Sequence, residues 1–128
     1  MSTPTPIQTN QAPAAIGPYS QGIAAGGLVF VSGQLGLDPQ SGEFAGPDLA
    51  AQARQALANV KVILEAAGCR LTQVAAVDVF LIDMADFAEF NGIYEAFFGS
   101  HKPARAVVAV KTLPKNARVE IKCLACGS

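Results

Sequence analysis

The sequence predicts an α+β fold in which two helices pack on one face of a mixed sheet, in the order β-β-α-β-α-β-β. Two stretches, residues 49–67 and 84–98, carry apolar side chains at helical spacing. Five short runs rich in β-branched and small apolar residues flank and separate them. With 128 residues, the chain is expected to form a single domain over residues 1–128.

The first dozen residues are rich in Pro, Thr and Gln, and we expect residues 1–12 to be a flexible lead-in. Residues 19–34, YSQGIAAGGLVFVSGQ, predict two short strands joined at Gly26-Gly27, a dipeptide typical of tight hairpins. Residues 36–48, GLDPQSGEFAGPD, consist of turn-forming pairs and predict a loop.

Asp48 can cap the first helix, which is expected to run to about Ala67 and to stop at Gly68. The run VAAVDVFLID over residues 74–83 is almost continuously apolar and predicts a strand that is buried on both faces. Asp83 can then cap a second helix that reaches about Phe98.

Two further strands are expected over residues 104–110, ARAVVAV, and residues 118–126, RVEIKCLAC. Two helices can cover only one face of the resulting sheet, yet several strands are apolar on both sides. The uncovered face therefore needs a partner, and self-association is the simplest way to supply one.

The composition narrows the possible functions. Charged residues make up 15% of the chain, against about 25% in typical soluble domains, and the net charge is −1 without any run of Lys or Arg. No basic patch is therefore predicted that could neutralise nucleic-acid phosphates. The chain has neither a secretory signal pattern nor an apolar stretch of the roughly 20 residues that span a bilayer, so we expect a soluble, cytoplasmic protein.

Several common sites are excluded by the residue inventory. His101 is the single histidine, which leaves neither a Ser-His-Asp triad nor a multi-histidine metal site unless subunits share one, and we interpret it as a surface residue. No glycine-rich phosphate loop occurs. The CxxC spacing of Cys123 and Cys126 lies at the end of a strand, so we interpret both as core or rim residues. With Cys69 they form an odd number of cysteines, which argues against a disulfide framework.

Arg105 and Glu120 are lone charges among apolar neighbours in the last two strands. Strand alternation puts Glu120 on the face opposite Val119 and Ile121, and Arg105 on the face of Val107 and Ala109. If Val119, Ile121, Val108 and Val110 pack under the helices, both charges project onto the uncovered face. They then form either an interfacial salt bridge without chemistry or a functional pair. In the functional pair the guanidinium binds a carboxylate and Glu120 manages a water molecule or proton.

Five segments resemble the RidA/YjgF family, and together they cover nearly all of the chain beyond the lead-in. They are IGPYSQG (16–22), FVSGQLGLDPQSGEF (30–44), QARQALANVKVILEAAG (52–68), FAEFNGIYEAFF (87–98) and PARAVVAVKTLPKNARVEI (103–121). The resemblance implies a chorismate-mutase-like fold and a homotrimer with sites in the clefts between neighbours. It also implies cofactor-free, metal-free hydrolysis of reactive enamines and imines to 2-keto acids and ammonia. Such substrates are 2-aminoacrylate/2-iminopropanoate and 2-aminocrotonate/2-iminobutanoate, which pyridoxal-phosphate enzymes release.

The resemblance also implies roles for individual residues. Arg105 would hold the substrate carboxylate, and Glu120 would position water and move a proton. The remaining contacts to the substrate would come from Tyr19, Ser32, Gly33, Asn91 and Val107. Gly33 suits a close approach because it lacks a Cβ atom.

The chain departs from the family pattern at two places beside Arg105. Val107 stands where many active bacterial members carry cysteine, and the shortened segment over residues 99–103 places Lys102 where an aromatic residue often precedes the proline. Both changes are expected to alter the shape of the site and its substrate preference. Two alternatives stay open. The first is a trimer that holds a 2-keto acid without turnover, and the second is an endoribonuclease or translation inhibitor, which the charge and the missing histidine pair disfavour.

Overall fold

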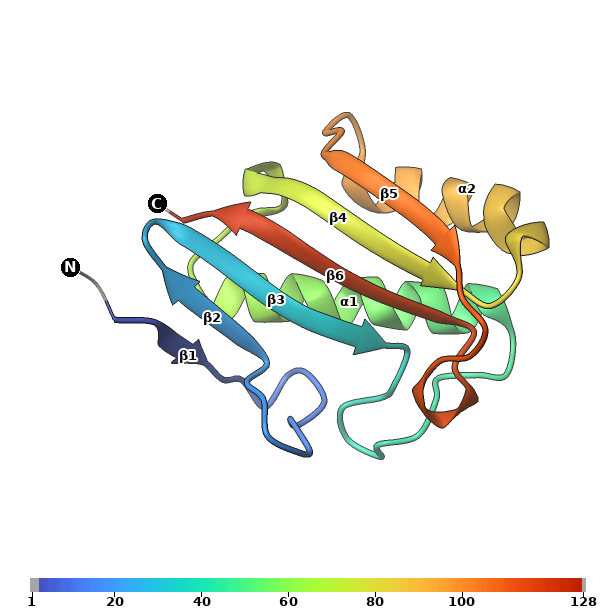
Figure 1. Ribbon diagram of the computed structural model, residues 1–128, viewed down its shortest axis with the longest axis horizontal. Helices are drawn as coiled ribbons and strands as arrows, with labels where there is room; N and C mark the ends of the chain where they lie inside the picture. Colours follow the sequence, from blue (N-terminus) through green and yellow to red (C-terminus); the bar gives the residue numbers. More distant parts are fainter. Residues whose placement is uncertain (1–2, 128) are drawn as a thin grey trace.

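The computed structural model describes residues 3–127, which form a six-stranded sheet with two helices on one face (Figure 1). The strand order is β1-β2-β3-β6-β4-β5, and every neighbouring pair is antiparallel except β4 and β5. The predicted α+β class is confirmed. The strands are β1 Thr5–Ile7, β2 Gly22–Ala25, β3 Leu28–Leu35, β4 Val74–Leu81, β5 Ala104–Ala109 and β6 Val119–Cys126.

The lead-in differs from the prediction of a flexible segment, because residues 5–7 form the edge strand β1 against β2. Pro6 is tolerated there since an edge strand leaves one side of its backbone unpaired. Ile7 is buried, and Gln21 ties down the following backbone by accepting a hydrogen bond from the Thr9 amide (2.8 Å) and donating one to the Thr9 carbonyl (3.0 Å). The order is therefore β-β-β-α-β-α-β-β.

The predicted hairpin is confirmed between β2 and β3. Its two turn residues, Gly26 and Gly27, have φ values of 57° and 78°, the left-handed region that a two-residue type I′ turn requires. The hairpin lies beside the central strand β6 through the pairing of β3 with β6.

Both predicted helices are present, with one shift in a boundary. Helix α1 spans Leu49–Ala66, and the Asp48 carboxylate caps it by accepting a hydrogen bond from the Ala51 amide at 3.2 Å. Asp83 instead caps a short 3₁₀ turn, Met84–Asp86, that precedes α2, Phe87–Phe98. Gly99, with φ of 67°, ends α2.

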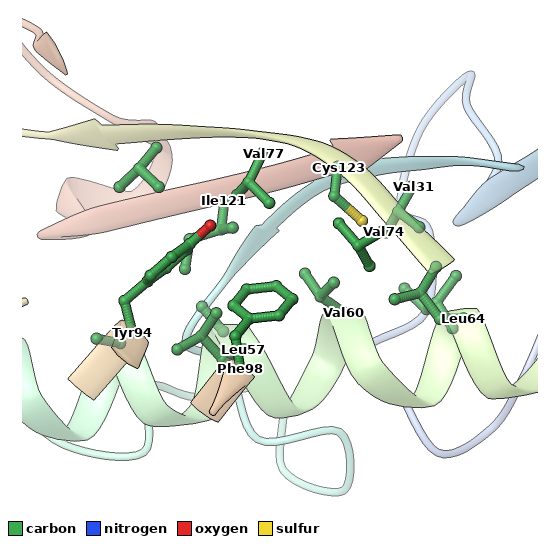
Figure 2. Close-up of a cluster of buried hydrophobic side chains, with 14 of the residues drawn as sticks. Val31, Leu57, Val60, Leu64, Val74, Val77, Tyr94, Phe98, Ile121 and Cys123 are labelled. Atoms are coloured by element: carbon green, nitrogen blue, oxygen red, sulfur yellow. The ribbon is translucent and has the colours of Figure 1, made fainter. Parts of the chain in front are cut away.

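The hydrophobic core fills the space between the helices and the sheet. Figure 2 shows Leu57, Val60 and Leu64 of α1 pointing from the helix toward the strands. They meet Val31, Val77 and Ile121 from the sheet, with Tyr94 and Phe98 of α2 in the same cluster. Val119 and Ile121 are fully buried, as strand alternation predicted.

The opposite face of the sheet is open in the single chain, so β4 is fully buried on the helix side alone. Val77, Val79 and Leu81 lie in the core, whereas Asp78 and Phe80 on the other face are only partly buried. Phe30 and Val108 on this open face are 44% and 46% exposed. Within residues 3–127, the structure has no helix with the length and apolar character to cross a bilayer.

Candidate functional site

Arg105 lies on the helix side of the sheet, which corrects its predicted place on the open face. In the parallel pairing of β4 with β5, Arg105 is opposite Val77 and Val107 is opposite Val79, both of them core residues. Val108, expected under the helices, faces out instead. Apart from Arg105, the residues of β5 are small or apolar on both faces, and nearly every residue of this edge strand is exposed. The alternation of residue types therefore does not indicate which face of β5 packs against the helices.

Helix α2 holds the Arg105 guanidinium in place. Arg105 Nη1 donates a hydrogen bond to Asn91 Oδ1 at 2.7 Å. The guanidinium carbon lies 4.7 Å from the ring centroid of Tyr94 and 5.8 Å from that of Phe87. Asn91 was predicted beside the site, and the structure brings it into direct contact with Arg105.

A pocket of about 360 Å³ opens beside this guanidinium. Tyr94, Phe98, His101, Lys102 and Arg105 are among the residues that line it, so the departure at Lys102 does fall next to Arg105. His101 is partly buried, which corrects its interpretation as a surface residue. Its Nε2 lies 2.7 Å from the Val74 carbonyl oxygen, and the N–H tautomer at Nε2 donates this hydrogen bond.

Glu120 projects from the open face of β6, and its carboxylate lies directly over Gly33. A Cβ atom on Gly33 would overlap with Glu120 Oε2 and would lie 2.9 Å from Cδ. The pairing of β3 with β6 shifts register between Val31 and Gln34, and this irregularity brings Gly33 beneath the carboxylate. The group that lies close to Gly33 within one chain is the Glu120 carboxylate, and the predicted contact of Gly33 with a substrate stays a prediction.

Partial burial raises the pKa of the Glu120 carboxyl above its ordinary value, and the nearby Lys122 ammonium opposes this shift. Lys122 also lies 3.9 Å from Asp78 on the neighbouring strand. This pair depends on the register of β4 against β6, which places Asp78 opposite Lys122.

A second, larger pocket of about 770 Å³ surrounds Glu120. It brings together Tyr19, Ser32, Gly33 and Glu120, four of the residues predicted for the site. The Ser32 hydroxyl donates to the Ser20 carbonyl, which fixes the Tyr19 segment against β3. The Tyr19 ring itself is 53% exposed.

The end of β3 and the residues after it, where Leu35 and Leu37 line this pocket, are anchored by a buried amide that the sequence analysis did not single out. Asn59 of α1 is 1% exposed and donates to the carbonyl oxygens of Leu35 and Leu37 at 3.1 and 3.0 Å. A polar residue in the apolar stripe of a predicted helix was the signal that could have found it.

The predicted site residues therefore form two groups on opposite faces of the sheet. Arg105, Asn91 and the half-buried Val107 belong to the helix side, and the pocket beside Arg105 contains none of Tyr19, Ser32, Gly33 or Glu120. Among residues 3–127, no group of three or more His, Cys, Asp and Glu side chains could hold a metal ion. One described chain by itself does not bring Arg105 and Glu120 to the same ligand.

The fold and these groups define a small α+β protein with an arginine pocket on one face of its sheet and a carboxylate pocket on the other. The chain belongs to the endoribonuclease L-PSP family, which is the RidA/YjgF family, and the family model matches residues 9–126. The predicted family is confirmed.

The relatives in sequence cover almost the whole chain. A RutC family protein of Pyrococcus horikoshii is 50% identical over 119 residues, 93% of this chain and 94% of its own length. A Salmonella typhimurium protein named 2-iminobutanoate/2-iminopropanoate deaminase is 49% identical over 122 residues, again 93% and 94% of the two chains. A Bos taurus protein of the same name is 48% identical over 119 residues, 93% of this chain and 87% of its own. These relatives confirm the prediction that the chain is an enzyme.

Solved structures agree with the fold. The structure of E. coli TdcF with bound serine has a TM-score of 0.93 at 43% identity, over 97% of this chain and 99% of that one. The yjgF gene product of E. coli has a TM-score of 0.91 at 47% identity, over 95% of this chain and 98% of that one.

Proposed function

We propose that the protein is a cofactor-free deaminase that hydrolyses short 2-imino acids, and the enamines that tautomerise to them, to 2-keto acids and ammonia. The substrates are 2-iminopropanoate and 2-iminobutanoate, the compounds for which relatives at 48% and 49% identity are named. The observation that carries the proposal is that the Arg105 guanidinium is held in place but takes part in none of the ion pairs of residues 3–127. The guanidinium is oriented by α2, and the ion pairs among residues 3–127 join other residues, Arg118 with Asp86 and Lys122 with Asp78.

An oriented guanidinium without an acidic partner is suited to a carboxylate ligand, which it binds through two parallel N–H···O bonds. The substrate carboxylate is the group that pyruvate-like and butyrate-like imines share. A structural neighbour, E. coli TdcF, is described with bound serine, which is also a small carboxylate-bearing molecule.

The reaction needs a water molecule and a group that moves protons. Water attacks C2 of the protonated imine while Glu120 takes a proton from the water. The product of this step is a tetrahedral carbinolamine. Glu120 then returns the proton to the amino nitrogen. As the C2–N bond breaks, the C2 hydroxyl becomes the keto carbonyl and gives its proton back to Glu120, and ammonia leaves, taking that proton as ammonium and restoring the carboxylate. The raised pKa of Glu120 brings its proton exchange closer to neutral pH, which favours both steps.

Arg105 and Glu120 act together in a homotrimer whose sites lie between subunits. One subunit supplies Arg105, Asn91 and Val107, and its neighbour supplies Glu120 with Tyr19, Ser32 and Gly33. The exposed aromatic and aliphatic side chains of the open face, such as Phe30 and Val108, support a partner on that face. Three free thiols, two of them buried, suit the reducing cytoplasm as the location of the protein.

The test couples a threonine dehydratase to this protein and follows the appearance of 2-oxobutanoate. We expect acceleration by the wild type and a loss of about 100-fold or more in kcat/KM for Arg105→Ala. Arg54→Ala, which removes an exposed arginine of α1, is the matched control and is expected to behave as wild type. Glu120→Gln should bind a 2-keto acid but lose rate.

The alternatives give different results in the same experiment. Binding of 2-oxobutanoate without any acceleration supports a trimer that holds keto acids and overturns the deaminase proposal. A mass in solution equal to one 13.2 kDa chain overturns the shared site.

A further inference from the structure

We infer that Tyr94, assisted by Phe87, is a positioning residue that sets the plane of the Arg105 guanidinium and thereby the approach of the substrate carboxylate. The inference rests on the proposed role of Arg105 as the carboxylate-binding group. It adds a rigid aromatic surface, on the core side of the arginine, to the residues that decide how tightly substrate binds.

The contact comes from one face of α2. Phe87, Asn91 and Tyr94 are spaced by four and three residues, so their side chains lie in one row along the helix. All three reach the same guanidinium: Asn91 through a 2.7 Å hydrogen bond, and the two rings at 5.8 and 4.7 Å from their centroids. A row of three contacts fixes a planar group in a way that a single contact does not.

Tyr94 is the rigid member of this row. Its side chain is 8% exposed and is packed between Phe90, at 5.8 Å between ring centroids, and Phe98, at 4.8 Å. Arg105 by contrast is exposed on an edge strand, where a long flexible side chain would sample many rotamers. The Tyr94 ring therefore supplies a fixed surface against which the otherwise flexible Arg105 side chain can pack.

This arrangement limits how an anion can reach Arg105. The guanidinium carbon lies over the Tyr94 ring, and Asn91 takes one of the five N–H donors of Arg105. The other N–H donors lie in the plane of the guanidinium, which lines the pocket, so a carboxylate that uses two of them binds edge-on and nearly coplanar with it. Tilting the guanidinium would tilt the bound substrate and misalign C2 with the attacking water.

The ring of Tyr94 carries this role, and its hydroxyl does not. The Tyr94 oxygen is buried, points toward the sheet in Figure 2, and has no hydrogen-bond partner among the described residues. A phenylalanine ring would present the same face to Arg105 while removing that unpaired hydroxyl. Leucine would fill part of the volume without a quadrupole or a flat surface.

The experiment compares Tyr94→Phe, Tyr94→Leu and Phe97→Leu in the coupled assay and in direct calorimetric binding of 2-oxobutanoate. Phe97 is an aromatic residue of the same helix that packs against the core without contacting Arg105, so its loss controls for damage to α2. We expect Tyr94→Leu to raise KM and the keto-acid Kd by about 10-fold, with a smaller change in kcat. Tyr94→Phe should restore both to within about twofold of wild type.

A double-mutant cycle with Arg105→Lys tests whether Tyr94 acts through Arg105. Lysine keeps the charge but lacks the planar fork, so Tyr94→Leu should have little further effect on Kd in that background. Equal effects of Tyr94→Leu in both backgrounds, or equal effects of Tyr94→Leu and Phe97→Leu, would overturn the inference. Because Kd is measured without turnover, an inactive wild type would defeat the proposed reaction while leaving this test intact.

Discussion

Arg105 and Glu120 lie on opposite faces of the same sheet, two strands apart. In the ladder that joins β6, β4 and β5, Arg105 is opposite the buried Val77, whereas Glu120 and Val108 are both opposite Phe80 on the open face. The two charged groups proposed to share a substrate therefore cannot meet within one subunit. This separation determines how the proposed site can be tested.

Two inactive variants should restore activity to each other. When Arg105→Ala and Glu120→Gln chains are unfolded together and refolded as mixed trimers, random assembly gives about a quarter of the interfaces an intact Arg105 and an intact Glu120. We expect keto-acid release to reappear at roughly that fraction of the wild-type rate in the coupled dehydratase assay.

The control for this mixing experiment refolds Arg105→Ala with Arg105→Lys, since neither chain can supply an intact arginine. Activity there should stay at the level of the separate variants. If the first mixture also stays inactive while its trimers form, both residues of each site come from one subunit, against the arrangement proposed.

Gly33→Ala should damage the carboxylate pocket. The added methyl group would overlap with the Glu120 carboxylate, which must then move or strain the neighbouring strand. We expect a loss of about 1–3 kcal/mol in unfolding free energy, measured by urea denaturation, and a fall in kcat of roughly 10-fold or more. Adding Glu120→Ala should recover the stability but not the rate. A Gly33→Ala protein with wild-type stability and kcat would contradict the close approach.

The raised pKa of Glu120 predicts a pH dependence of stability. A carboxyl whose folded pKa exceeds its ordinary value of 4.5 binds its proton more tightly in the folded state. Its contribution to stability is therefore fully present below pH 4.5 and is lost as the pH rises through the folded pKa. Urea denaturation across this range should show the Glu120→Gln variant gaining stability relative to wild type as the pH increases, and then a constant difference. A difference that shrinks with increasing pH would mean that the folded pKa is lowered.

The three cysteines should react with thiol reagents at very different rates. Burial raises the pKa of the Cys123 thiol to about 12, and Cys69 is also buried with a raised pKa, whereas Cys126 is exposed. At pH 8, iodoacetamide followed by mass analysis should modify Cys126 in the native protein and the other two only after unfolding. Prompt modification of native Cys123 would contradict the packing of β6 against α1.

Sequence signals predicted those parts of the fold that depend on local chemistry. The Asp48 cap, the stripe of α1 and the Gly26-Gly27 turn each encode their structure within a few residues, and each prediction was confirmed. The edge strand β1 was missed because its formation depends on backbone pairing with β2 and on one buried residue, Ile7.

The site was less accessible to sequence reasoning. Arg105 was placed on the wrong face because the neighbouring alanines and valines of β5 suit either side of an edge strand. The resemblance supplied Asn91 and Gly33, and the structure explains them through the Arg105 hydrogen bond and the Glu120 carboxylate. Tyr94 belonged to a recognised apolar stripe, but only the tertiary structure distinguishes a ring that supports a guanidinium from one that fills the core.

The place of β6 in the sheet has a consequence for how the chain acquires its structure during synthesis. Strands β1, β2 and β3 form one half of the sheet and β4 and β5 the other, and the two halves are joined only through β6, which follows all of them in sequence. A nascent chain that has not yet delivered residues 119–126 can form the hairpin and α1 but cannot unite the sheet. The strand that joins the two halves of the sheet is therefore synthesised last. Because Glu120 belongs to this strand, its carboxylate takes its place only when the sheet is completed.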